Sequence, residues 1–111
     1  MKESELQTQV LRLLRIKGIF HWRMALGGIP HKIAGKIIYK KNALKGFPDL
    51  CGVFPGGIMW AIELKSAKGI LSIEQKYWIA NLKSNGVRVA VCRSLEEVIN
   101  FITQNLKDLK T

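Results

Sequence analysis

The sequence predicts a mixed α/β fold, built as one domain over residues 1–111. Apolar residues recur at helical spacing near both ends of the chain, and short β-branched or aromatic runs bounded by Gly and Pro lie between them. A chain of 111 residues, 48% of them hydrophobic, can bury roughly two-thirds of its unfolded surface. We therefore expect a single core and the element order α-β-(β)-β-β-α-β-α.

The first two elements are a helix and a strand. Ser4 is the expected N-cap of the helix. The helix is expected to end at Lys17-Gly18, because Gly readily adopts the left-handed conformation that follows a helix. Ile19 to Met24 is aromatic and β-branched enough to form a strand. One face of the helix carries the apolar residues Leu6, Val10, Leu13 and Leu14.

The segment from Leu26 to Gly46 is interrupted by Gly27-Gly28, Pro30 and Gly35. It contains one short β-like run, Lys36-Ile37-Ile38-Tyr39. Because Gly and Pro break regular structure while the segment is rich in Lys, we expect a basic loop or ribbon on the surface.

The middle of the chain predicts a hairpin. Two strand-like runs, Leu50 to Phe54 and Ile58 to Lys65, flank the turn residues Pro55-Gly56-Gly57. If the turn consists of these three residues, Phe54 faces Ile58, and this pairing fixes the register of the whole antiparallel ladder.

A second helix follows the hairpin. Ser72 opens it, and Gln75 occupies the position that completes a capping box. The helix is expected to run to about Asn85, where Gly86 stops it.

A strand and a helix complete the chain. Val87 to Cys92 is an apolar run typical of a buried strand. Ser94 and Glu97 predict a second capping box at the start of the last helix. One face of that helix carries Val98, Ile99, Ile102 and Leu106.

The charge of the chain, formally +10, is distributed unevenly. No Asp or Glu occurs from Leu6 to Pro48, a stretch that contains nine cations. Such a region attracts polyanions, so nucleic acid is the expected partner, and a merely soluble basic surface is the alternative. A membrane-surface role is disfavoured, because the stretch has no long amphipathic helix with its cations on one face.

Several other classes are excluded by composition. The longest apolar runs are far shorter than the ~20 residues that span a bilayer, so no membrane partner is expected. The first residues lack the apolar core of a secretory signal, which makes the cytoplasm the expected location. Cys51 and Cys92 are too few for a disulfide scaffold or a Cys-based zinc site, and we expect reduced, buried thiols.

The hairpin register brings scarce acids together. It places Asp49 directly opposite Glu63, on one face and with Cβ atoms about 5 Å apart. Lys65 shares that face, because side chains alternate along a strand. Two like charges so close are destabilising without a cation between them, and Mg²⁺ accepts carboxylate, water and phosphate oxygens as ligands. The pattern indicates a metal site with a lysine beside it; an exposed salt bridge between Lys65 and the acids is the structural alternative.

These residues resemble the PD-(D/E)xK nuclease signature: Gly46-Phe47-Pro48-Asp49 is followed, after thirteen residues, by Glu63-Leu64-Lys65. The fuller pattern is similar to the VRR-NUC family of virus-type replication-repair nucleases, in its stand-alone phage and viral form. That family has a Glu and then a Gln on its first helix, matched here by Glu5 with Gln9. Its helix-opening motif is matched by Leu71 to Trp78, which includes Gln75. The resemblance covers residues 4–92.

The resemblance implies a restriction-endonuclease-like fold with a central mixed sheet flanked by helices. It also implies a catalytic Mg²⁺ or Mn²⁺ bound by Asp49, Glu63 and the backbone carbonyl of Leu64, with no small-molecule cofactor. Lys65 would position the attacking water and support the transition state. Glu5 would bind a second metal or its water shell, and Gln75 would hydrogen-bond near Lys65 or the scissile phosphate.

The implied function is hydrolysis of DNA phosphodiesters by an endonuclease. The small stand-alone members resemble Holliday junction resolvases, so the resemblance implies branched DNA as substrate and a homodimer as the assembly. A non-catalytic DNA-binding module and an RNA-directed nuclease are the alternatives. The residues expected to contact nucleic acid are basic: Arg12, Arg23, Lys32, Lys36, Lys40, Lys41, Lys45 and Lys68.

Some of these residues have structural alternatives. Glu5 is favourable at a helix N-terminus whether or not it binds metal, and Gln75 can serve the capping box alone. His21 and His31 are expected to be ordinary or phosphate-contacting residues rather than catalytic ones. The aromatic residues are more typical of a core or an interface than of base stacking.

Overall fold

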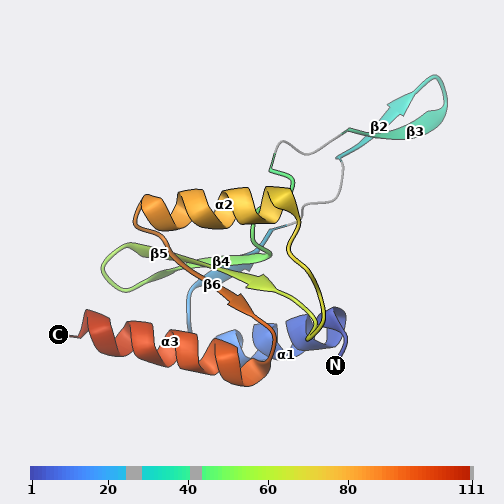
Figure 1. Cartoon of the computed structure of the whole chain (residues 1–111). Coiled ribbons are helices and arrows are strands. Elements are labelled where there is room, and N and C mark those ends of the chain that lie inside the picture. Colours follow the sequence, from blue (N-terminus) through green and yellow to red (C-terminus); the bar gives the residue numbers. More distant parts are fainter. Residues whose placement is uncertain (25–28, 41–43, 111) are drawn as a thin grey trace.

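The computed structural model describes residues 1–24, 29–40 and 44–110, and within 29–40 it describes the side chains of residues 32–37. A four-stranded sheet lies between helix α2 on one face and helices α1 and α3 on the other (Figure 1). A separate two-stranded ribbon, β2–β3, stands away from these layers (Figure 1). The helices are α1 (Glu3–Ile16), α2 (Ile73–Ser84) and α3 (Leu95–Leu109). The strands are β1 (His21–Arg23), β2 (Ile29–Ile33), β3 (Lys36–Lys40), β4 (Leu50–Phe54), β5 (Ile58–Leu64) and β6 (Arg88–Cys92).

The sheet is mixed, which confirms the predicted fold class. Its strand order is β1-β4-β5-β6, with β4 antiparallel to both β1 and β5, and β6 parallel to β5. The parallel pair requires a crossover, which α2 supplies between β5 and β6. The prediction that Val87 to Cys92 is buried is wrong in part, because β6 is an edge strand and only Cys92 is fully buried in it.

The predicted hairpin and its register are confirmed. Phe54 pairs with Ile58 and Leu50 pairs with Ile62, as a three-residue turn requires. A Cβ on Gly52 would collide with the indole of Trp60 on the neighbouring strand, so only glycine fits beneath that ring.

Alternation along β5 divides the sheet into two faces with different tasks. The residues of β5 that include Trp60 and Ile62 point toward α1 and α3 and form the hydrophobic core with them. Ala61 and Glu63 alternate with these residues along β5, so their side chains lie on the opposite face, which α2 covers. The core residues contributed by the two helices are Leu6, Val10, Leu14, Val98 and Ile102.

Of the three predicted helix N-caps, the one of α2 is confirmed in full, whereas those of α1 and α3 differ from the prediction. In α2, Ser72 and Gln75 form the complete capping box. In α1 the N-cap is Lys2, not Ser4, and no side chain caps that end. In α3 the box is half formed: Ser94 accepts from the Glu97 backbone N–H, while the Glu97 carboxylate accepts from the backbone of Arg93 instead.

The strand predicted for Ile19 to Met24 is shorter in the structure, where it spans His21–Arg23. It pairs only with β4 and forms an edge of the sheet. The helix before it ends at Ile16, and Gly18 adopts a φ of 66° directly after that end. Gly18 therefore has the left-handed conformation predicted from its position.

The segment predicted as a basic loop or ribbon forms a ribbon with two strands, where the β-like run alone predicts one. Ala34 and Gly35 make its tight turn with φ values of 51° and 78°. Positive φ at both central residues is the geometry that joins twisted strands in a two-residue hairpin. None of the helices that the structure describes is both long and apolar enough to cross a membrane.

Candidate active site

Asp49 and Glu63 lie side by side at one end of the sheet, on the face that α2 covers. Asp49 directly precedes β4, and its Oδ2 accepts a hydrogen bond from the backbone N–H of Leu64, at 3.1 Å. The charge of Asp49 in turn raises the pKa of Glu63. Asp49 is therefore bonded to the end of β5 directly beside Glu63, next to the last paired residues, Leu50 and Ile62.

Glu63 is a buried acid whose pKa the fold raises to about 8. The causes are burial of its carboxylate and the nearby negative charge of Asp49, which together outweigh the opposing charge of Lys65. Burial also raises the pKa of Asp49, against the hydrogen bond from Leu64. Only 2% of Glu63 is exposed. A pair of carboxylates in this state is suited to a cation, because a positive ion relieves both the burial and the repulsion.

Gln75 connects this pair to α2 and completes the helix cap at the same time. Its Oε1 accepts from the backbone N–H of Ser72, at 2.9 Å. Its Nε2 donates to Oε1 of Glu63, at 2.8 Å. The capping role therefore does not prevent a role in the site, because the amide group has a separate atom for each bond. The observed partner is Glu63, and a contact near Lys65 or the scissile phosphate stays a prediction.

Gly46 lets the loop before β4 lie against the first turn of α2. Its φ is 86°, and a Cβ at this position would lie 2.6 Å from Cβ of Glu74 and 2.8 Å from the backbone nitrogen of Gln75. The close approach explains why a Gly stands three residues before Asp49: any side chain would push the loop away from the helix that carries Gln75.

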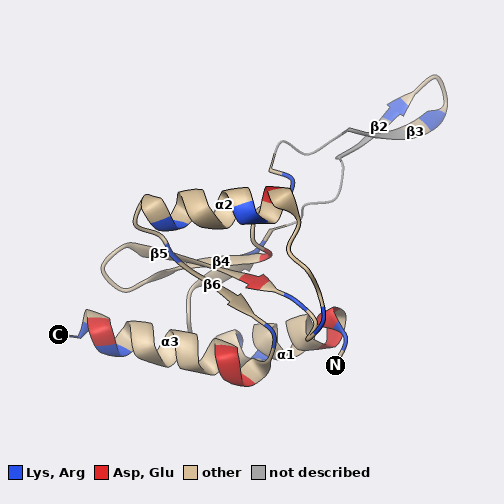
Figure 2. Cartoon of the chain, in the orientation of Figure 1, with Lys and Arg blue, Asp and Glu red and all other residues tan. Residues whose placement is uncertain are grey.

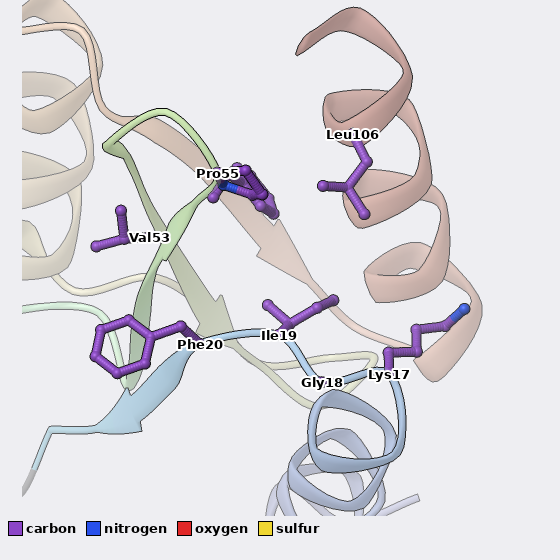
Figure 3. A pocket seen from close by; sticks show the side chains of 8 residues that line it. Lys17, Gly18, Ile19, Phe20, Val53, Pro55 and Leu106 are labelled. Carbon is purple, nitrogen blue, oxygen red and sulfur yellow. The ribbon is translucent and has the colours of Figure 1, made fainter. Parts of the chain in front are cut away.

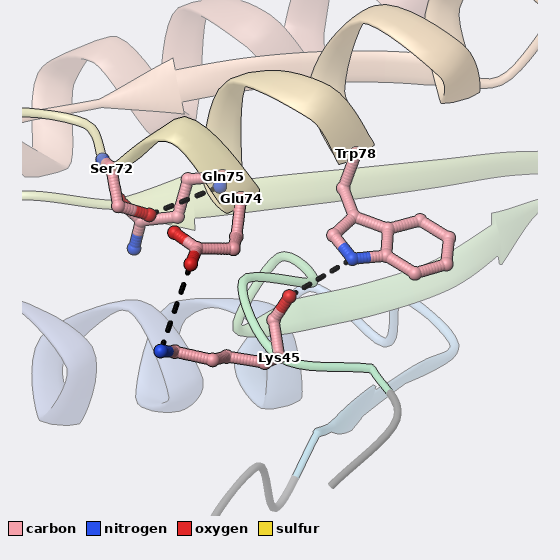
Figure 4. Close-up of polar contacts among 5 residues, drawn as sticks. All are labelled: Lys45, Ser72, Glu74, Gln75 and Trp78. Carbon is pink, nitrogen blue, oxygen red and sulfur yellow. Dashed lines mark hydrogen bonds and ion pairs between the residues drawn. The ribbon is translucent and has the colours of Figure 1, made fainter.

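Lys45 and Trp78 fasten the same loop to α2 (Figure 4). The indole Nε1 of Trp78 donates to the backbone carbonyl of Lys45, at 3.0 Å, and the Lys45 ammonium lies 3.6 Å from Oε1 of Glu74. Phe47 packs edge-on against the Trp78 ring, with centroids 5.2 Å apart. The indole contacts are the stronger attachment, since the ion pair is exposed and exposed pairs contribute little.

Lys65 follows β5 directly and is half-buried beside the two acids, whose pKa values its charge lowers. The loop after it is held by Arg93, whose Nη1 donates to the carbonyl oxygens of Ser66 and Gly69, at 2.8 and 2.7 Å. This loop carries Lys68, which is exposed. Arg93 is a positioning residue that sequence patterns do not reveal, because only the fold brings the end of β6 beside the end of β5.

The first helix also carries an acid whose charge acts on this site, the exposed Glu3. The charge of Glu3 raises the pKa of both Asp49 and Glu63. Glu3 lies three residues before Leu6, on the helical face that also carries the buried Val10. The buried stripe of α1, extended by one turn toward the N-terminus, is the sequence signal that identifies it.

Glu5, the acid that the resemblance assigns to the site, lies on a different side of α1. It is exposed, and it is one turn from Gln9, which lines a hollow between α1 and the start of α3 together with Leu95. The charge that acts on Asp49 and Glu63 from α1 is that of Glu3, and metal binding by Glu5 stays a prediction.

The donor set fits a divalent cation that keeps part of its hydration. Within residues 1–24, 29–40 and 44–110, no three His, Cys, Asp or Glu side chains are placed to hold an ion by themselves. Mg²⁺ characteristically binds through one or two carboxylates and completes its shell with water and substrate phosphates. Asp49 and Glu63 supply two carboxylates, and the Leu64 carbonyl is adjacent in the chain.

The basic residues expected to contact nucleic acid are spread over several elements (Figure 2). Arg23, on β1, is close enough to the acids for its charge to lower the pKa of Asp49. Lys32 and Lys36 are exposed at the tip of the ribbon. Arg12 instead lines the hollow between α1 and α3. Lys41 and the side chain of Lys40 are outside the described residues, as is the side chain of His31.

A separate pocket lies at the opposite end of the sheet (Figure 3). It has a volume of about 500 Å³ and contains no acid. Its lining is mostly apolar, with Lys17 as its one charged side chain. The chemistry of the carboxylate pair is therefore separate from this pocket, which is lined by Lys17, Gly18, Ile19, Phe20, Val53, Phe54, Pro55 and Leu106.

The metal-free protein is expected to lose stability as the pH rises toward 8. The folded state holds a proton on Glu63 up to a pKa of about 8, whereas the unfolded chain releases it near the ordinary value of 4.5. The stabilisation is fully present below the lower value and disappears as the pH passes the upper one. Urea unfolding in EDTA between about pH 5 and pH 9 measures this slope. Glu63→Gln is expected to remove most of it, and an unchanged slope in that variant contradicts the assignment.

Comparison with known proteins identifies the family from the sequence and a shared fold from solved structures. The sequence matches the family model of the VRR-NUC domain over residues 2–96. A solved structure titled as a VRR-NUC domain is 20% identical, with a TM-score of 0.65, over 93% of this chain and 96% of that chain. A second, titled as a VRR-NUC domain protein, is 23% identical, with a TM-score of 0.63, over 96% of this chain and 89% of that chain. At these identities the two structures establish the shared fold. A search of curated proteins finds no match.

Proposed function

The chain belongs to the VRR-NUC domain family, a family of nucleases, and from this premise we propose that it is a Mg²⁺- or Mn²⁺-dependent endodeoxyribonuclease. The observation that carries the proposal is the pair formed by half-buried Asp49 and buried Glu63, which both have a raised pKa and have Lys65 beside them. An exposed salt bridge does not account for this arrangement, because Glu63 is buried and its carboxylate accepts from the neutral amide of Gln75.

The residues of the site divide the work of hydrolysis among them. Asp49, Glu63 and the Leu64 carbonyl would hold the cation, which supplies Lewis acidity toward the scissile phosphate and lowers the pKa of a bound water. Lys65 orients the attacking water and stabilises the negative charge that develops on the phosphate oxygens. Gln75 is a positioning residue: it fixes the Glu63 carboxylate from the end of α2.

Glu3→Gln is expected to weaken Mn²⁺ binding and to slow cleavage by about tenfold, the lower end of the effect of residues around a metal's direct ligands. The reason is that the charge of Glu3 acts on both metal-binding acids. Glu5→Gln is the matched control on the same helix turn, and it is expected to change both quantities less than twofold. Calorimetric Mn²⁺ titration and single-turnover cleavage provide the measurements. A larger effect of Glu5→Gln identifies Glu5 as the contributing acid instead.

We further propose that branched DNA is the substrate and that the enzyme acts as a homodimer. The net charge of +10 suits a partner that presents several phosphate backbones at once. A four-way junction has two equivalent strands to cut, and a two-fold dimer presents two active sites in the matching symmetry.

A gel assay on a four-way junction, a flap and a linear duplex, each with Mg²⁺, Mn²⁺ or EDTA, tests the proposal. We expect paired cuts in the junction with either metal and none in EDTA. Equal cutting of the linear duplex contradicts structure selectivity. Binding of DNA without cleavage under all conditions identifies a non-catalytic binding module, and preferential cutting of the matched RNA identifies an RNA-directed nuclease.

A further inference from the structure

The β2–β3 ribbon projects from the layered body of the protein and makes its own two-stranded sheet (Figure 1). Every residue of its tip, from 32 to 37, is exposed. Ile33 and Ile37 are 52% and 65% exposed although they are large and apolar. A two-stranded ribbon is marginally stable in water without something to pack on. The exposed tip is therefore a surface suited to a partner.

The charge and pairing of the tip specify the chemistry of that partner. Ile33 pairs with Lys36, and Lys32 pairs with Ile37. Because directly paired residues share a face, each face of the tip presents one cation beside one apolar side chain. No acid occurs between Leu6 and Pro48 to compensate these cations. A tip that docks on a protein is expected to have one apolar face and one polar face, but the two faces of this tip are alike. A nucleic-acid groove suits such a tip, because it presents phosphates to both faces.

The ribbon is rooted beside the candidate active site. The strand before it, β1, ends at Arg23, which pairs with Leu50. The backbone N–H of Met24 then donates to the carbonyl of Asp49 itself, at 2.8 Å. On the return, the chain is fastened to α2 through Lys45. Both connections of the ribbon thus leave from the end of the sheet that carries the two acids.

We propose that the β2–β3 ribbon is an arm that grips duplex DNA next to the bond to be cut, with its tip in a groove and with Lys32 and Lys36 toward the opposite phosphate walls. The inference rests on DNA being the substrate proposed above, and it adds how the duplex is held. The major groove, about 12 Å wide, admits a two-stranded β-ribbon. The apolar Ile33 and Ile37 contact sugars or base edges without sequence-specific hydrogen bonds.

The first experiment measures DNA binding of the full chain by fluorescence anisotropy in EDTA, where no cleavage occurs. Lys32→Glu combined with Lys36→Glu reverses the charge of the arm. Lys107→Glu combined with Lys110→Glu makes the same change of charge on the exposed end of α3 and is the matched control. We expect the arm variant to bind a 30-base-pair duplex at least about tenfold more weakly. Its salt slope is expected to fall by about two, because two DNA phosphates are no longer neutralised by lysines. An equal weakening in both variants overturns the arm.

The second experiment locates the tip on the DNA. Ile33→Cys gives a uniquely reactive thiol, because the native Cys51 and Cys92 are buried. An iron–EDTA group attached there is expected to cut both strands within a few nucleotides, at one side of the bond that the enzyme hydrolyses. Lys107→Cys, labelled in the same way, is the control for free diffusion of radicals. A diffuse pattern, indistinguishable from that control, overturns placement in a groove.

These results separate the arm from the enzymatic proposal. If the wild type cleaves DNA and the arm variant binds and cleaves equally well, the arm is wrong while the nuclease stands. If the arm variant fails to bind DNA but the wild type never cleaves, the arm stands and the nuclease proposal is wrong. Sedimentation of the wild type and the arm variant tests whether the ribbon instead binds a second copy of the chain. If the wild type is a dimer and the arm variant is a monomer with unchanged DNA binding, the ribbon holds a second copy and the inference is overturned.

Discussion

Asp49→Asn is expected to lower the rate of DNA cleavage in Mg²⁺ by about a thousandfold while DNA binding persists. Asn keeps an oxygen that accepts from the Leu64 N–H but loses the negative charge that binds a cation. Loss of a metal's stabilisation of the transition state corresponds to several kcal/mol, and each 1.36 kcal/mol is about tenfold in rate. Single-turnover cleavage and anisotropy binding on the same DNA measure the two effects.

The effect of the same substitution on the melting temperature distinguishes loss of the metal site from a folding defect. Burial and neighbouring acids raise the pKa of both carboxyls, so the charged pair is unfavourable in the metal-free protein. Asp49→Asn is therefore expected to keep or raise the melting temperature in EDTA at about pH 8 while it abolishes cleavage. Glu96→Gln, an exposed acid in the first turn of α3, is the control and leaves both unchanged. Cleavage retained by Asp49→Asn contradicts the site.

Gly46→Ala is expected to destabilise the fold by about 2–5 kcal/mol and to reduce cleavage in the molecules that remain folded. An alanine there adopts an unfavourable positive φ and places its Cβ against the first turn of α2, from which Gln75 reaches Glu63. Urea unfolding gives the stability, and cleavage per folded molecule gives the effect on the site.

Gly56→Ala separates the two causes. Gly56 has a φ of 91°, close to that of Gly46, but a Cβ added there meets nothing within 4 Å. This variant therefore reports backbone strain alone, expected at about 1–2 kcal/mol with full cleavage activity. The difference between the two variants measures the close approach of the loop to α2. Equal effects of both substitutions contradict a role for that approach.

The hairpin could be predicted in detail because its information is local. The turn Pro55-Gly56-Gly57 fixes which residues pair, and the register then carries Asp49 to Glu63 without knowledge of any other element. The Ser72–Gln75 capping box is local in the same way. The family resemblance is confirmed by the match to the VRR-NUC family model, and the mixed sheet by the structure.

Other features were beyond the sequence because they depend on contacts between distant segments. The carbonyl groups that Arg93 holds, and the indole attachment of Trp78 to Lys45, join residues far apart in the chain. Glu3 was missed for a different reason: motif spacing points to Glu5, whereas the buried stripe of α1 runs back through Val10 and Leu6 to Glu3. Strand β2 was not predicted because it contains Pro30, whereas its partner β3 has a clear β-like run.

The central claim is that Asp49 and Glu63 hold one divalent cation. Anomalous scattering from a crystal soaked in Mn²⁺ tests it directly. We predict a peak within about 2.5 Å of a carboxylate oxygen of each residue, with water completing the shell and Glu3 nearer to the ion than Glu5. A crystal that binds Mn²⁺ elsewhere, or whose Asp49 and Glu63 bind none at millimolar Mn²⁺ above pH 8, contradicts the account.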